Sequence, residues 1–210
     1  MRLLLINPNT SAATTDAMLA IARDAAPDGV VIEGATARFG AALITDEAAL
    51  SVAAEAVLDV PRPGGLDGII VAAFGDPGLG TLRRSLAIPV TGIAEAGMAE
   101  AARHGRFVVV TTTPALAGSI ARTAARYGHG QAFAGVRLTT GEPADLMADP
   151  ARLFTALASA CRDAIGEDGA SAIVIGGGPL ATAAHALRQS ITVPVIEPIP
   201  AAVRLALARL

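Results

Sequence analysis

Short apolar runs alternate along the chain with longer stretches in which apolar and polar residues recur at helical spacing. The runs are four to six residues long, and glycine, proline or another loop-forming residue closes most of them. This combination predicts buried strands that end in loops. The expected strands are 2–6, 30–35, 69–74, 88–93, 106–110, 135–138, 172–175 and 192–196.

The stretches between these runs predict helices that connect the strands. Asn9, Thr10 and Ser11 are suitable N-cap residues for the first helix, and Pro27 follows its end. Strands that alternate with helices predict an α/β fold with parallel sheets. We expect helices at 12–26, 44–60, 82–86, 95–104, 117–127, 150–166, 180–189 and from residue 200 onward.

The second half of the chain repeats the pattern of the first. The run Arg2–Ile6 corresponds to Arg106–Val110, and Gly68–Val71 corresponds to Ala172–Ile175, each pair being about 104 positions apart. Such a repeat predicts two similar units that fold in the same way. The fold class we expect is α/β, with two pseudo-symmetric parallel-sheet halves that face each other across a central cleft, residues 1–104 and residues 105–210. The C-terminal helix is expected to pack on the first half.

The loops that follow the strands are the first place to look for chemistry. In parallel sheets, ligands bind where strands end and helices begin. The run Gly68–Val71 leads into the loop Ala73–Gly78, and the repeat pairs Ala73 with Gly177. We therefore expect these two positions on opposite walls of the cleft. A symmetric pair of this kind suits chemistry on both faces of one carbon atom.

Composition narrows the classes of function. The chain is 52% hydrophobic and 17% charged, with a mean hydropathy of +0.53, which is typical of a packed enzyme-like domain. No apolar run is long enough to span a bilayer, and the apolar start is too short for a signal peptide, so we expect a cytoplasmic protein without membrane contact. The net charge is −3 and aromatics make up 3%, so nucleic acid is not an expected partner. The absence of lysine excludes lysine Schiff-base chemistry.

The single cysteine and the histidines indicate neither a disulfide nor a metal site. Cys161 lies in a helical stretch on the same face as Leu153 and Leu157, so we expect a buried thiol that is not a nucleophile. The three histidines are scattered along the chain. We expect no metal and no other cofactor.

Five motifs give the chain a family resemblance. They are Ile6–Ser11 (Ile-Asn-Pro-Asn-Thr-Ser), Ala72–Leu79 (Ala-Ala-Phe-Gly-Asp-Pro-Gly-Leu), Pro89–Ala96, Val109–Thr112 and the glycine-rich turn Ile175–Leu180. With them the chain resembles the aspartate/glutamate/hydantoin racemase superfamily, nearest its hydantoin and allantoin racemase branch. The resemblance implies an isomerase of the racemase or epimerase type, without a cofactor, that forms a homo-oligomer. It also implies proton abstraction and return at the carbon alpha to a carbonyl, in a hydantoin-like cyclic ureide or a small amino-acid-derived carboxylate.

The sequence departs from this family at the reacting positions. The family's racemases use two cysteines, one on each wall, and these positions fall on Ala73 and Gly177. Three explanations stay open: an engineered replacement at Ala73, a natural branch that uses other groups, or a loss of activity. Two carboxylates are candidate bases, Asp76 and Glu47. The alternative is that Asp76 forms a cap or turn before Pro77 and that Glu47 stabilises the start of a helix.

Other strand-end groups are candidates for holding the substrate. Backbone N–H groups, amides and hydroxyls at these positions suit a carboxylate or an imide and stabilise an enolate. The alternative for the Asn and Thr residues is helix capping. The candidates are Asn7, Asn9, Thr10, Phe74, Gly75, Thr111, Thr112, Thr113, Gly178 and Pro179.

Two further functions compete with a racemase-type enzyme. One is a cysteine-independent lyase or hydrolase on the same scaffold, with Asp76, Glu47 or a bound water as its base. The other is a non-catalytic binder of small carboxylates or ureides. A dinucleotide-binding enzyme has less support, because the glycines of Gly75–Gly80 lack the fingerprint spacing.

Overall fold

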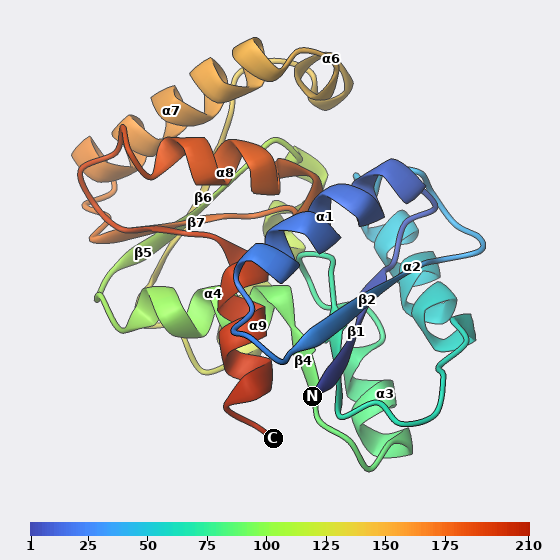
Figure 1. Cartoon of the computed structure of the whole chain (residues 1–210). Coiled ribbons are helices and arrows are strands. Elements are labelled where there is room, and N and C mark those ends of the chain that lie inside the picture. Colours follow the sequence, from blue (N-terminus) through green and yellow to red (C-terminus); the bar gives the residue numbers. More distant parts are fainter.

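Two parallel four-stranded sheets form the frame of the molecule, as the computed structural model of residues 1–210 shows (Figure 1). The strand order is β2-β1-β3-β4 in the first sheet and β6-β5-β7-β8 in the second. The expected α/β class, with two equivalent halves, is therefore confirmed. The strands are β1 Arg2–Asn7, β2 Val31–Thr36, β3 Gly68–Val71, β4 Val90–Gly92, β5 Phe107–Thr111, β6 Phe133–Leu138, β7 Ala172–Ile175 and β8 Val195–Ile196.

Nine α-helices and two short 3₁₀ turns connect and cover the strands. The helix Pro143–Ala148 was not expected from the sequence, and the strand expected at 192–196 begins only at Val195, after a proline that cannot donate to a sheet. The helices are α1 Ala12–Asp24, α2 Glu47–Asp59, α3 Leu79–Ser85, α4 Ile93–Ala102, α5 Ala117–Arg126, α6 Pro143–Ala148, α7 Pro150–Gly166, α8 Ala181–Leu187 and α9 Pro198–Leu207, with η1 Pro114–Leu116 and η2 Gly178–Leu180.

The strands β3 and β7 lie at equivalent places inside the two sheets. Every residue of both strands is buried, as expected for parallel strands covered on both faces. The strand β3 pairs with β1 and β4, and β7 pairs with β5 and β8. The last ladder bonds are equivalent too: the amide of Ala72 donates to Ile6, and that of Gly176 donates to Val110. The loops that follow β3 and β7 therefore begin at equivalent points of the two sheets.

The final helices of the two halves interlock. Helix α9 packs against α4, α1, β3 and β4, while α4 packs against β7 and β8 of the other sheet (Figure 1). Gly97 on α4 permits this approach, because a side chain there would lie 3.2 Å from Val174. Two ion pairs connect α4 to the C-terminal segment, Arg204 of α9 with Glu100 at 2.7 Å and Arg209, just beyond α9, with Glu95 at 2.8 Å. The strands divide between residues 1–104 and 105–210, but the helices bind the halves together.

Candidate active site

A cavity lies at the carboxyl ends of the central strands of both sheets. Its walls come from the loops after β1, β2, β3, β5 and β7, and from η1, η2, α5 and α6. Ligands of parallel α/β proteins bind at such strand ends. The lining residues are Asn9, Leu43, Ile44, Ala72, Ala73, Phe74, Thr111, Thr112, Thr113, Leu116, Ile120, Met147, Gly176, Gly177, Gly178, Pro179 and Leu180.

Ala73 and Gly177 both line this cavity, one from each half, and both are partly exposed. Gly177 has an extended backbone, with φ of 166°, and a side chain added there would meet only the flexible Leu180 side chain, at 3.2 Å. Its neighbours are different. A side chain on Gly176 would lie 2.6 Å from a valine, and one on Gly178 would lie 2.7 Å from a methionine. Of the three glycines, Gly177 is the one that tolerates a side chain.

A tight turn presents Ala73 and Phe74 to the cavity. The amide of Asp76 donates to the carbonyl of Ala73 at 3.0 Å, which closes the turn. Gly75, the third residue of the turn, has a φ of +114°, and glycine adopts this conformation without steric cost. The motif Phe-Gly-Asp after β3 is thus explained by the backbone that it has to form.

Asn9 is a side-chain donor in the cavity wall, and Asn7 orients it. The Asn9 Oδ1 accepts from the Asn7 side chain at 2.7 Å and from the amide of Ser11 at 2.9 Å. The Asn9 amide group is therefore left to donate to a ligand. Asn7 also donates to Thr15 at 3.0 Å and is 1% exposed. Asn7 lies behind the wall and does not line the cavity.

The threonine run at the end of β5 contributes hydroxyls to the cavity. The Thr111 hydroxyl donates to the carbonyl of Gly176 at 2.8 Å and thereby ties the ends of β5 and β7 together. The Thr113 hydroxyl lies 3.1 Å from that of Thr111. The Thr112 side chain makes no hydrogen bond within the chain, so its hydroxyl is free to donate and to accept.

Several backbone amides of the cavity wall also lack a hydrogen-bond partner within the chain. Those of Ala73, Phe74 and Gly178 are among them, so both halves supply unpaired donors. Unpaired N–H groups at strand ends are suited to a carbonyl oxygen on which negative charge develops. The cavity can therefore hold an oxygen-rich ligand and stabilise its enolate.

The cavity wall contains no titratable side chain. None of its residues is Asp, Glu, His, Lys, Arg, Cys or Tyr. A general acid or base must lie within hydrogen-bond reach of the proton that it transfers. The walls therefore provide donors for binding but no side chain with a pKa suited to proton transfer.

Asp76 lies outside the cavity, in contrast to its expected role as a base. It is 4% exposed, and its carboxylate accepts from the amides of Ala94 at 2.9 Å and Glu95 at 2.8 Å and from the Tyr127 hydroxyl at 2.6 Å. Burial raises the pKa of Asp76 to about 6, against the opposing effect of these three hydrogen bonds. Asp76 caps the N-terminus of α4 rather than the short helix that follows it.

Glu47, Thr10 and Gly75 also lie outside the cavity wall. Glu47 and Gly75 border a separate, more open groove of about 410 Å³, and the Glu47 carboxylate is paired with Arg122 at 2.6 Å. The amide of Thr10 donates to the carbonyl of Ala41 at 3.1 Å. These three residues are therefore not placed to contact a molecule in the cavity.

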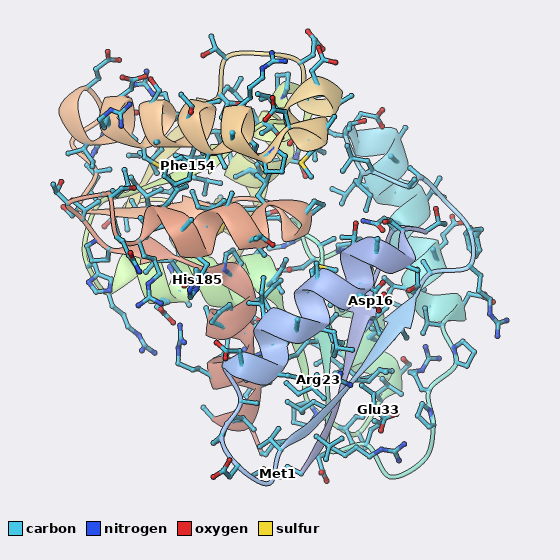
Figure 2. The ribbon with its side chains drawn as sticks, turned by 45° about the horizontal axis from the view of Figure 1, so that its top comes forward. Met1, Asp16, Arg23, Glu33, Phe154 and His185 are labelled. Atoms are coloured by element: carbon cyan, nitrogen blue, oxygen red, sulfur yellow. The ribbon has the colours of Figure 1, made fainter.

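The remaining nucleophiles and ring nitrogens lie elsewhere. Cys161 is fully buried on α7, and burial raises the pKa of its thiol to about 12, so the expectation of an inert buried thiol is confirmed. His185 lies on α8 (Figure 2), where its Nδ1 is 3.3 Å from the Glu197 carboxylate. No group of three or more His, Cys, Asp or Glu side chains is placed to hold a metal ion. None of the helices combines the length with the apolar character that a membrane span requires.

The apolar side of the cavity was not expected from the sequence. It consists of side chains that come from several elements, including the unexpected helix α6, and only Leu180 belongs to one of the sequence motifs. A single apolar residue in a loop or a helix carries no signal for a binding site on its own. These side chains are Leu43, Ile44, Leu116, Ile120, Met147 and Leu180.

Comparison with known proteins identifies the class to which this site belongs. The chain matches the Asp/Glu/hydantoin racemase family over residues 3–206 and therefore belongs to that family. The resemblance found in the sequence is confirmed. Since racemases are isomerases, the expected enzyme class, an isomerase of the racemase type, is confirmed as well.

Individual relatives cover nearly the whole chain. A hydantoin racemase from Paenarthrobacter aurescens is 30% identical, over 98% of this chain and 89% of the relative. The crystal structure of an allantoin racemase from Pseudomonas fluorescens has a TM-score of 0.94 at 33% identity, over 99% of this chain and 90% of that one. An allantoin racemase from Klebsiella pneumoniae has a TM-score of 0.93 at 35% identity, over 99% and 86% of the two chains.

Proposed function

We propose that the cavity binds a neutral, hydantoin-like cyclic ureide and that the chain acts on the carbon alpha to its carbonyl, by proton abstraction and return. Family membership supports the reaction type, and two relatives named for hydantoin and allantoin support the substrate class. The observation that carries the proposal is the cavity wall, with unpaired amides on both halves at the equivalent positions Phe74 and Gly178 and without charged side chains.

The uncharged wall favours a ureide over a carboxylate substrate. No arginine, histidine or lysine lines the cavity to offset a buried negative charge. Burying an ionised carboxylate without a paired charge is costly, whereas a neutral imide needs only donors and acceptors. The Asn9 amide, the Thr112 hydroxyl and the free backbone amides supply them. The apolar side of the cavity then takes an apolar substituent on the chiral carbon.

In this mechanism, loss of the alpha proton leaves an enolate whose oxygen accepts hydrogen bonds from the wall. The amides of Ala73, Phe74 and Gly178 are the donors for that oxygen. Since no side chain of the wall is titratable, water next to Ala73 and Gly177 has to take and return the proton. A positioned acid or base contributes about 10²–10⁴-fold in rate, so we expect the native chain to be slow.

Installing thiols at the two wall positions tests this proposal. In the double variant Ala73→Cys with Gly177→Cys, we expect loss of optical rotation of benzylhydantoin to be about 10²–10⁴-fold faster than with the native chain. The matched control is Ala208→Cys, which adds an exposed thiol outside the cavity wall. A double variant that folds and binds benzylhydantoin, but racemises it no faster than the native chain does, would contradict the proposal.

Binding without conversion is the second candidate function, and the absence of a titratable side chain from the cavity favours it. Two measurements on the native chain distinguish a binder from an enzyme. Calorimetry measures the binding of benzylhydantoin, and deuterium uptake at the chiral carbon in D₂O measures proton exchange. Binding with deuterium uptake at the rate of buffer alone supports a binder. Uptake faster than in buffer supports the enzyme.

We also propose that copies of the chain associate and that the protein acts in the cytoplasm. The apolar side chains of Val31, 56% exposed, and Phe39, 41% exposed, support association, because burial against a second copy would remove them from water. Light scattering of the purified chain tests this, and a monomer at micromolar concentration would contradict it. The cytoplasmic location stays a prediction from the sequence.

A further inference from the structure

The Asp76 carboxylate lies at a junction of three elements from both halves of the molecule. It belongs to the loop after β3, accepts two hydrogen bonds from the start of α4 and accepts a third from Tyr127 at the end of α5. Two of the donors are among the first amides of a helix, where a negative charge is favoured. Both carboxylate oxygens are therefore engaged.

The recess that holds this carboxylate is shaped for it. Gly92 precedes α4, and a side chain there would lie 2.1 Å from Cγ of Asp76. The carboxylate thus occupies the space that the Cβ atom of any other residue at position 92 would need. Asp76 itself has a φ of +53°, a left-handed conformation that is unfavourable for residues other than glycine. The contacts of the carboxylate hold the backbone in that conformation.

This junction connects two walls of the cavity. On one side, Asp76 closes the turn that carries Ala73 and Phe74, both of which line the cavity. On the other side, Tyr127 follows helix α5, and Ile120 of that helix lines the cavity as well. The Tyr127 hydroxyl therefore fixes the first-half turn relative to the second-half helix.

We propose that Asp76 is a positioning residue that, together with Tyr127 and Gly92, sets the spacing between the Ala73 turn and the α5 wall of the cavity. It does not act as the base, because its oxygens are occupied and lie outside the cavity. The inference rests on the proposed function only in taking the cavity as the substrate site.

The charge state of the junction is consistent with this role. The Tyr127 pKa is raised by burial and by the neighbouring Asp76, so its hydroxyl stays protonated and donates. A buried carboxylate is costly unless it is paired or hydrogen-bonded, and here it is held by three donors instead of a cation. The side chain of Glu95 opposes ionisation of Asp76, and Arg209 binds Glu95 on the solvent side. An apolar side chain would occupy this buried site without the desolvation penalty of a carboxylate.

Hydrogen exchange of the ligand-free protein tests the proposal in the variants Tyr127→Phe and Asp76→Asn. We expect amide exchange to accelerate about tenfold at Asp76 and Leu79, the hydrogen-bonded amides of residues 73–79, and at Ala94 and Glu95, with β1 unchanged. The matched control is Asp168→Asn, which removes the charge of a carboxylate that accepts from Arg137 at 2.9 and 2.5 Å within the second half. The control should leave exchange in residues 73–79 unchanged.

Two results would overturn the proposal: exchange that accelerates equally in β1 and residues 73–79, which would mean a purely structural role, or no acceleration in residues 73–79. Gly92→Ala, which displaces the carboxylate, should give the same local pattern as Asp76→Asn. A kinetic readout adds to this. In the double-cysteine variant, Tyr127→Phe should lower kcat about tenfold and change KM less than twofold. Because exchange is measured without ligand, failure of the native chain to bind hydantoins would overturn the proposed function and leave this inference standing.

Discussion

Different kinds of interaction stabilise the two turns that carry the equivalent positions Ala73 and Gly177. The turn after β3 is held by polar contacts, with the Asp76 carboxylate bound by two amides and by Tyr127. The turn after β7 is held by close packing of the backbone, since Gly176 and Gly178 have no room for a side chain. The two halves of an internal repeat can therefore keep the same backbone conformation although different contacts stabilise it. We therefore expect pH to change the stability of the wall after β3, and added side-chain volume to change the stability of the wall after β7.

The largest effect that separates the walls is expected from pH. The pKa of Asp76 is about 6 in the folded protein and 3.8 ordinarily, so the folded state binds more protons between these values. The contribution of Asp76 to the free energy of unfolding is fully present below pH 3.8 and is lost as the pH rises through 6. The native chain should lose roughly 3 kcal/mol relative to Asp76→Asn across this window. Urea unfolding from pH 4 to pH 7 measures the difference, and a difference that does not change with pH would contradict the polar support of this wall.

A volume change should affect the other wall next. Gly176→Ala places a methyl group 2.6 Å from Val109 in the core, and such overpacking costs about 1–3 kcal/mol. Gly177→Ala is the matched control, because its methyl group meets only the mobile end of Leu180 and should cost under about 1 kcal/mol. Urea unfolding at one pH compares them. Equal losses of stability in the two variants would contradict the account that close packing at Gly176 stabilises this turn.

The smallest effect is expected from a carboxylate that belongs to neither wall. The Glu47 side chain is 55% exposed and pairs with Arg122, whose side chain is 65% exposed. Exposed pairs contribute about 0–1 kcal/mol, so Glu47→Gln should change stability by less than about 1 kcal/mol and leave benzylhydantoin affinity and turnover unchanged. Loss of turnover in this variant would support the alternative of a lyase or hydrolase with Glu47 as its base.

The frame of the molecule could be predicted because it depends on local patterns. Apolar runs such as Ala172–Ile175 are fully buried strands, and the helix Pro150–Gly166 has the expected bounds. The strand expected to reach Phe74 ends at Val71, because the chain turns there to present Ala73. Helix α6 is only six residues long, and its N-cap Glu142 makes no capping hydrogen bond, so Pro143 at its first position is a weak signal on its own.

The candidate site was predictable only where it follows from strand ends. Ala73, Asn9, the threonine run and the glycine-rich turn all line the cavity, because strand ends of a parallel sheet meet at one edge. The role of Asp76 could not be predicted, since its partners Ala94 and Tyr127 are 18 and 51 positions away in the sequence. The lack of a titratable side chain in the cavity is likewise a property of the assembled walls.

The central claim is that Ala73 and Gly177 face one substrate carbon from opposite sides, and the single variants Ala73→Cys and Gly177→Cys test it most directly. Each should carry one thiol on one wall, so each should remove the alpha proton from only one enantiomer of benzylhydantoin. Deuterium uptake at the chiral carbon in D₂O, measured separately for the two pure enantiomers, is the measurement. We predict that the two variants accelerate uptake by opposite enantiomers. Acceleration for the same enantiomer in both variants would contradict the account.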